Sequence, residues 1–181
     1  MSYLAGFIEE STVDGKGIRN TIFISGCTHN CKGCHNKEAQ NFKFGEEITD
    51  EIIDKIINLT ITNDLVDGIT LSGGDPLHPN NVDTSLKIMV KYYEEARKHD
   101  IPYSVWMYTG YLIEDLIKRK DPKVDSILRH LDMLVDGPFI EKLRDPMIDF
   151  AGSSNQRFLN EDTLRKYLGG YIIWKNNYWM I

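Results

Sequence analysis

Residues 21–34 read TIFISGCTHNCKGC, and this stretch joins a β-rich run directly to all three cysteines of the chain. The apolar and β-branched residues at 21–25 predict a buried strand. Cys27, Cys31 and Cys34 follow in the loop after that strand. An odd, tightly clustered set of cysteines does not make a disulfide framework, whereas several thiolates on one loop suit a metal site. The sequence therefore indicates metal chemistry in this loop.

The rest of the chain alternates short β-rich runs with longer helical patterns. Because strands and helices alternate, we expect a parallel sheet with right-handed crossovers and with the helices outside it. The predicted strands are 21–25, 68–72, 103–108 and 133–136; the predicted helices cover about 49–60, 81–99 and 112–129; and a helix at 160–168, a strand at 171–175 and an apolar tail at 178–181 carry weaker signals.

Polar and glycine-rich motifs stand where the predicted strands end. Cys27 follows the first strand, Gly73-Gly74-Asp75 the second and Thr109 the third, and Asp136 closes the fourth. Since α/β folds bind ligands at the carboxyl ends of parallel strands, we expect these loops to form one site.

Length and charge limit the fold and exclude some partners. The 181 residues suit one domain and are too few for a complete eight-unit (β/α) barrel, which needs about 250. With 27 acidic and 21 basic residues and no long basic run, nucleic acid is not an expected partner. The first ten residues carry two acids, and no apolar run approaches about 18 residues. We therefore expect no secretory signal, no membrane span and a cytoplasmic protein.

Two kinds of metal centre fit three cysteines spaced C-x3-C-x2-C. One is a structural zinc completed by His29 or His35. The other is a [4Fe-4S] cluster with three cysteine-bound irons and a fourth iron open to a substrate. Structural zinc loops usually join two distant pairs of ligands, and this sequence has no second pair. The cluster is therefore favoured over zinc and over inert thiols.

The motifs in this order resemble the radical S-adenosylmethionine (SAM) superfamily, of which the cysteine spacing is the most specific mark. Residues 13–19 (VDGKGIR) are similar to the glycyl-radical activating enzymes, although Lys16 stands where proline is common. Within that group, the chain resembles the activating proteins of anaerobic (class III) ribonucleoside-triphosphate reductases. The stretches similar to this branch are 71–79 (LSGGDPLHP), 108–111 (YTGY), 135–139 (VDGPF) and 152–157 (GSSNQR).

The resemblance implies a partial, laterally open (β/α) barrel with a mostly parallel sheet and helices outside. It also implies a single radical SAM domain over residues 1–181, with a core at about 13–158 and a C-terminal extension at about 159–181.

Two cofactors are implied as well, a [4Fe-4S] cluster and SAM. Bare backbone at Gly73 and Gly74 would approach the methionyl part of SAM, and Asp75 would accept from its ammonium group. By resemblance, the residues around Cys34 would lie near adenine and Thr109 near ribose. The expected iron ligands are Cys27, Cys31 and Cys34; the expected SAM contacts are Gly33, Cys34, His35, Gly73, Gly74, Asp75 and Thr109; and Asp136 is a candidate catalytic residue.

The reaction implied by the resemblance starts with reduction of the cluster by a flavodoxin or ferredoxin. SAM is then cleaved to methionine and a 5′-deoxyadenosyl radical, which takes a Cα hydrogen from one glycine of the large reductase subunit. The donors of residues 152–157 would suit the backbone of that partner. We expect His29 and His78 to be solvated rather than ligating, and Arg157 alone would be a weak surface ion-pair residue.

Two other functions stay open at this point. One is another small radical SAM enzyme, either a pyruvate formate-lyase activase or an enzyme acting on a small molecule. The other is a noncatalytic iron-sulfur or zinc module that serves electron transfer or binding. Iron and sulfide analysis together with a SAM cleavage assay would separate an enzyme from such a module.

Overall fold

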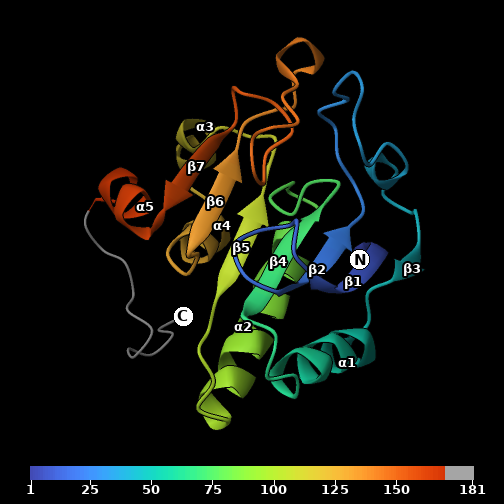
Figure 1. Ribbon diagram of the computed structural model, residues 1–181, viewed down its shortest axis with the longest axis vertical. Helices are drawn as coiled ribbons and strands as arrows, with labels where there is room; N and C mark the ends of the chain where they lie inside the picture. Colours follow the sequence, from blue (N-terminus) through green and yellow to red (C-terminus); the bar gives the residue numbers. More distant parts are fainter. Residues whose placement is uncertain (170–181) are drawn as a thin grey trace.

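The structure is a computed structural model that describes residues 1–169, and one seven-stranded sheet forms its centre (Figure 1). Its strands are β1 (Tyr3–Ser11), β2 (Arg19–Ile24), β3 (Glu46–Glu47), β4 (Gly68–Gly73), β5 (Val105–Tyr108), β6 (Met133–Asp136) and β7 (Arg157–Asn160). Their order in the sheet is β3-β1-β2-β4-β5-β6-β7. The pairings from β2 through β4 and β5 to β6 are parallel. The carboxyl ends of these four strands therefore meet at one edge of the fold.

Five α-helices and two short 3-10 turns connect the strands. They are α1 (Asp50–Ile61), α2 (Val82–Lys98), α3 (Ile113–Lys118), α4 (Pro122–Leu128), α5 (Glu161–Tyr167), η1 (Glu38–Gln40) and η2 (Glu141–Leu143). The Thr49 hydroxyl caps α1 by accepting from the backbone N–H of Ile52 at 3.4 Å. None of the described helices is both long and apolar enough to cross a membrane.

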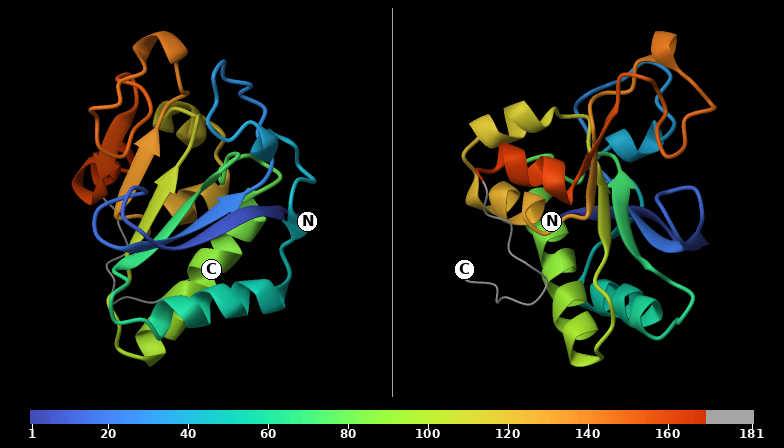
Figure 2. Two further views of the ribbon diagram at one scale, coloured as in Figure 1. Left: turned by 45° about the vertical axis from the view of Figure 1, so that its right-hand side comes forward. Right: turned by 60° about the vertical axis from the view of Figure 1, so that its left-hand side comes forward.

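The core lies between the sheet and the helices. Figure 2 (right) shows α3, α4 and α5 on one side of the sheet and the loop after β1 on the other. Two helices contribute apolar stripes to this core: Ile53 and Ile57 of α1 and Met89 and Ala96 of α2 are buried in the main apolar cluster. This packing holds the strand ends at fixed positions, which a site built from their loops requires.

The central strands and their helices confirm the predicted β/α alternation, and three antiparallel strands correct the expected parallel sheet. β1 and β3 extend one side of the sheet, and β7 extends the other. β3 and β7 lack the continuous apolar run that marks a buried parallel strand, and β1, although apolar from Tyr3 to Ile8, is only partly buried. In β7, for example, Leu159 is buried while Phe158 and Asn160 are exposed. The strand predicted at 171–175 and the tail at 178–181 lie outside the described residues.

The helical region predicted at 112–129 is divided into α3 and α4. Lys120 adopts a φ of 52°, a conformation that ends a helix. Asp121 then caps α4 by accepting from the N–H of Lys123 at 2.8 Å, and Pro122 occupies the first turn.

The VDGKGIR motif lies at the end of the sheet opposite the cysteines, because Arg19 begins β2 and Cys27 follows its end. The Arg19 side chain is wholly buried and donates to Thr70 Oγ1 at 2.8 Å and to the Ile69 carbonyl at 2.6 Å. Its guanidinium also lies 5.6 Å from the centre of the Trp106 ring. Lys16, where the motif departs from its usual form, is exposed. The motif therefore stabilises the end of the sheet that lies opposite the cysteines.

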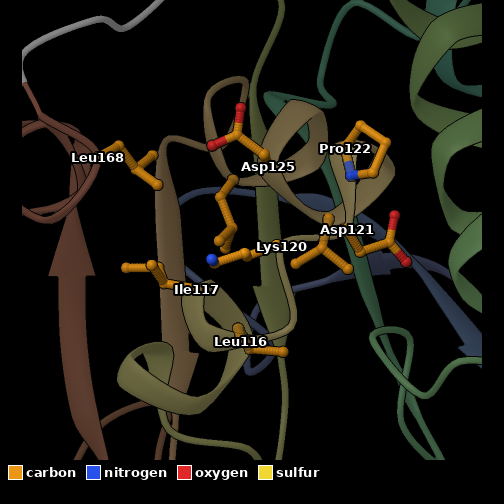
Figure 3. A pocket seen from close by; sticks show the side chains of 9 residues that line it. Leu116, Ile117, Lys120, Asp121, Pro122, Asp125 and Leu168 are labelled. Carbon is orange, nitrogen blue, oxygen red and sulfur yellow. The ribbon is translucent and has the colours of Figure 1, made fainter.

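A pocket of about 340 Å³ lies between α3, α4 and Leu168 (Figure 3). Its lining includes Leu116, Ile117 and Leu128 and contains none of the residues predicted for the site. The candidate site must therefore be built from the strand-end loops rather than from this pocket.

Candidate metal centre

The three cysteines lie on one loop that leaves the carboxyl end of β2 and rises above the sheet (Figure 1). All three are free thiols and are half-buried. Gly26, Asn30 and Gly33 have positive φ angles of 107°, 48° and 74°. These left-handed residues turn the backbone repeatedly, which lets a short segment present several side chains to one point.

A backbone N–H group points at one of the sulfurs, since the N–H of His29 donates to Cys27 Sγ at 3.4 Å. Burial raises the pKa of Cys31, and the nearby backbone N–H of Phe139 opposes that rise. The pKa of Cys27 is raised to about 11, chiefly by burial and to a smaller extent by the neighbouring Asp75, Cys31 and Cys34, while the His29 N–H opposes the rise. Since a bound cation stabilises the thiolate, metal binding would release protons here.

These features fit an iron-sulfur cluster. Three thiols on one loop supply three ligands, and N–H donors to cysteine sulfur are among the contacts that tune such clusters.

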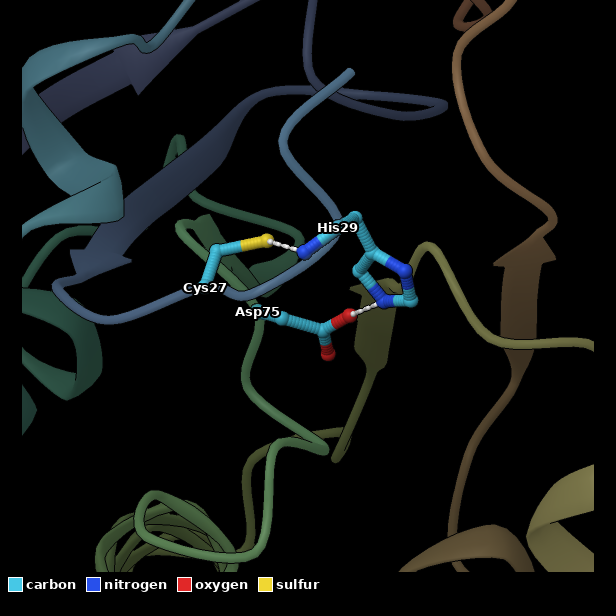
Figure 4. Close-up of side chains that lie close together, drawn as sticks. All are labelled: Cys27, His29 and Asp75. Atoms are coloured by element: carbon cyan, nitrogen blue, oxygen red, sulfur yellow. Dashed lines mark hydrogen bonds and ion pairs between the residues drawn. The ribbon is translucent and has the colours of Figure 1, made fainter.

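The histidine in the cysteine loop is held by the loop after β4 (Figure 4). His29 Nε2 lies 2.9 Å from Asp75 Oδ2, and the Asp75 carboxylate is wholly buried. The same carboxylate accepts from the backbone N–H groups of Leu77 at 2.9 Å and Gly110 at 3.0 Å, and from the Thr109 hydroxyl at 2.9 Å. Asp75 therefore ties together the loops that follow β2, β4 and β5.

The expectation that His29 is solvated is wrong, and its ring has a further neighbour. Tyr111 contacts the imidazole edge to face, with ring centres 4.3 Å apart. A Cβ added at Gly110 would come within 2.5 Å of the imidazole, so only glycine leaves room for this ring. Arg119 lies 3.9 Å from the centre of the Tyr111 ring. Residues 108–111 (YTGY) therefore pack against the cysteine loop through the His29 ring.

Asn81, just before α2, joins the same loops from below. Its buried Nδ2 group donates to the carbonyls of Ser25 at 3.0 Å, Gly26 at 3.1 Å and Asp75 at 2.9 Å. The sequence predicts Asn81 only as the start of a helix. Its position six residues after Asp75, where the helix begins, is the feature of the sequence that indicates a contact with the loop after β4.

Gly73, which ends β4, and Gly74, which follows it, are required by packing. A Cβ at Gly74 would lie 2.7 Å from the Gly26 carbonyl oxygen and 2.6 Å from that of Ala39. Gly73 has a φ of 110°, and a Cβ there would lie 2.6 Å from the backbone nitrogen of Ile24. Backbone beside the cysteine loop therefore occupies the side of Gly74 toward which a side chain would project.

Asp136 lies at the end of β6 in a separate network. Its buried carboxylate accepts from the Ile113 N–H at 2.8 Å and from Arg157 Nε at 2.8 Å. Arg157 also forms two hydrogen bonds to Glu114, at 2.9 and 2.8 Å. Arg157 is therefore more than the weak surface residue expected, because it pairs with a wholly buried carboxylate.

The other residues predicted to contact SAM differ in their exposure to solvent. Thr109 is buried and directs its hydroxyl at Asp75, whereas Gly33 and His35 are exposed beside Cys34. For a zinc ion, Cys27, His29 and Asp75 offer ligand atoms within 4.8 Å of one another, but that group takes only one of the three cysteines.

Comparison with known proteins agrees with an iron-sulfur centre. Residues 13–159 match the family described as "4Fe-4S single cluster domain". The chain is 39% identical over 162 residues to the anaerobic ribonucleoside-triphosphate reductase-activating protein of Haemophilus influenzae, covering 86% of this chain and 96% of the relative. The protein of the same name from Escherichia coli K12 is 43% identical over 145 residues, covering 80% and 89%. That of enterobacteria phage T4 is 30% identical over 156 residues, covering 86% and 92%.

Proposed function

This chain belongs to the family of anaerobic ribonucleoside-triphosphate reductase-activating proteins, and we propose that it generates a glycyl radical on the large subunit of that reductase. It is a radical SAM enzyme, and its cofactors are a [4Fe-4S] cluster and SAM. The observation that carries the proposal is the loop of three free, half-buried cysteines at the carboxyl end of β2.

Cys27, Cys31 and Cys34 are the proposed iron ligands. When bound and reduced, the cluster supplies the electron that cleaves SAM to methionine and the 5′-deoxyadenosyl radical that takes hydrogen from glycine. The protein's own part is to bind and orient. The loop held by His29, Asp75 and Asn81 keeps the thiols at the strand ends, where they can meet SAM.

SAM would lie against the same strand ends. The Thr109 hydroxyl donates to Asp75 and keeps acceptor capacity for a ribose hydroxyl. His35 and the Gly33 backbone are exposed beside Cys34, where adenine can pack. Backbone at Gly73 and Gly74 would contact the methionyl end of SAM. The Asp75 carboxylate, which also holds the loops together, would accept from the ammonium group of SAM.

The proposed substrate is a loop of the large subunit. Among the described residues, β3 and β7 are the two outer strands of the sheet and do not pair with each other. This supports a partial barrel that is open at the side, where a polypeptide can enter. We place the protein in the cytoplasm as a single domain, reduced by a flavodoxin or ferredoxin.

The test is SAM cleavage by protein reconstituted anaerobically with iron and sulfide. With a one-electron reductant, the protein should release methionine and 5′-deoxyadenosine in equal amounts. Single Cys27→Ala, Cys31→Ala and Cys34→Ala variants should lose the cluster absorbance and the cleavage together. Stoichiometric zinc without iron in the reconstituted protein would contradict the proposal.

A further inference from the structure

The polar segment Gly152 to Arg157 directs its side-chain donors inward, onto the turn that follows β6. Asn155 Nδ2 donates to the Pro138 carbonyl at 2.8 Å, and Gln156 Nε2 donates to the Gly137 carbonyl at 3.2 Å. These donors were expected to face a partner protein. In the structure they are already occupied by this chain.

Ser153 is the most enclosed residue of the segment. It is wholly buried, and its hydroxyl accepts from the Ile140 N–H at 3.1 Å. The N–H of Ser154 donates to the Leu143 carbonyl at 2.8 Å. A Cβ at Gly152 would lie 3.0 Å from the Phe139 ring, so glycine lets the ring pack against this backbone. The segment therefore holds residues 138–143 by hydrogen bonds at Pro138, Ile140 and Leu143.

Residues 138–143 in turn contact the cysteine loop. Glu141 forms an ion pair with Lys32 at 3.0 Å, and the Phe139 backbone N–H lowers the pKa of Cys31 against the effect of burial. Glu141 Oε1 also lies where a Cβ at Gly33 would reach it, at 2.9 Å. Both views of Figure 2 show the two segments rising side by side above the same end of the sheet.

We propose that Ser153 and Asn155 are positioning residues for the iron-sulfur site: they hold residues 138–143 against the cysteine loop, with Glu141 beside Gly33 and the Phe139 backbone near Cys31. A backbone N–H dipole near a cluster stabilises the extra negative charge of the reduced form and so raises its reduction potential. The inference rests on the proposed function, because it requires a cluster on Cys31.

The proposal is tested on full-length protein carrying its reconstituted cluster. Ser153→Ala removes the acceptor of the Ile140 N–H, and Asn155→Asp removes the donor to Pro138. Ser154→Ala is the matched control for the potential, because its side chain is exposed and only its backbone makes the contact. The readouts are the midpoint potential from a titration followed by electron paramagnetic resonance, the iron content, and the rate of cluster loss in air.

Ser153→Ala and Asn155→Asp should bind iron as the wild type does, titrate at a more negative potential and lose the cluster several-fold faster in air. Ser154→Ala should match the wild type. If Ser153→Ala does not fold, Asn155→Asp, at a half-buried side chain, decides the matter.

Unchanged potential and air sensitivity, with loss of reductase activation alone, would overturn the inference and assign the segment to the partner. A wild-type protein that holds no cluster would contradict the proposed function instead.

Discussion

Asp75 is a buried carboxylate with four hydrogen-bond donors around it, and three of those donors belong to the neighbouring loops. His29, Thr109 and Gly110 each reach it at about 3 Å. Buried carboxylates are costly unless such donors surround them. The contacts therefore make Asp75 a residue that orders the site before any ligand binds.

Replacing Asp75 should therefore destabilise the protein in the absence of SAM. Asp75→Ala leaves four buried donors without their acceptor, and we expect the free energy of unfolding to fall by about 3 kcal/mol. Urea denaturation of the cluster-free protein measures this change. Asp54→Ala, at a largely exposed side chain, is the control and should change little. Unaltered stability combined with weaker SAM binding would show that Asp75 acts as a ligand only.

At the scale of elements, the junction between the end of β4 and the base of the cysteine loop decides the site's shape. The Gly74 N–H donates to the Ile24 carbonyl at 2.7 Å, and the Asp75 N–H donates to the Gly26 carbonyl at 3.0 Å. These bonds continue the β2–β4 pairing into the loops, so a change in one loop must move the other.

Gly74→Ala is accordingly expected to damage the cluster site as well as SAM binding. The new methyl group would overlap the carbonyl oxygens of Gly26 and Ala39, which are backbone and cannot rotate away. Iron and sulfide content after reconstitution should fall several-fold. Gly6→Ala in β1 is the matched control, because its Cβ would meet only the Phe23 ring at 3.9 Å. Full cluster loading in Gly74→Ala would refute this packing argument.

Arg157 joins β7, β6 and α3 through two carboxylates. Its hydrogen bonds lower the pKa of Glu114 to about 2. A carboxyl group with a lowered pKa adds stability above its ordinary pKa of about 4.5, and that stability is lost as the pH falls toward 2.

Arg157→Ala should cost about 2 kcal/mol at pH 7, because Asp136 stays buried without its cation while exposure of Arg157 reduces the loss. The difference in unfolding free energy between wild type and variant should shrink from pH 5 to pH 2. Denaturation at several pH values measures it. Lys118→Ala, which removes an exposed pair with Asp115, is the control. A difference independent of pH would argue against this ion-pair network.

The sequence predicts the central elements better than the outer ones, for a physical reason. Residues 68–72 and 133–136 are buried on both faces and read as continuous β-rich runs. β1 and β7 pair antiparallel and are partly exposed, so their residues mix apolar and polar types. The residues of β1 and β7 therefore do not predict the positions of these strands, which only the order of strands in the sheet shows.

For the whole molecule, the position of the site followed from topology, whereas its internal contacts did not. Strand ends placed Cys27, Asp75 and Thr109 together, and the structure joins Thr109 to Asp75 directly. The pairing of His29 with Asp75 links residues 46 positions apart, and that of Ser153 with Ile140 depends on a loop folding back. Spacing along the chain carries no signal for such contacts.

One end of the sheet is structural and the other carries the candidate site. The buried guanidinium of Arg19 and the loop after β1 stabilise the first end. The cysteine loop and residues 138–143 lie at the second end. The proposed partial barrel would leave a lateral approach to the cysteine end. The large reductase subunit is proposed to enter there with its glycine.

Electron paramagnetic resonance of the large reductase subunit, mixed anaerobically with this protein, SAM and a reductant, tests the central claim most directly. We expect a glycyl radical on that subunit that requires every component and is absent with Cys31→Ala. Cleavage of SAM without any radical on the subunit, while a small metabolite is consumed with stoichiometric release of 5′-deoxyadenosine, would contradict it.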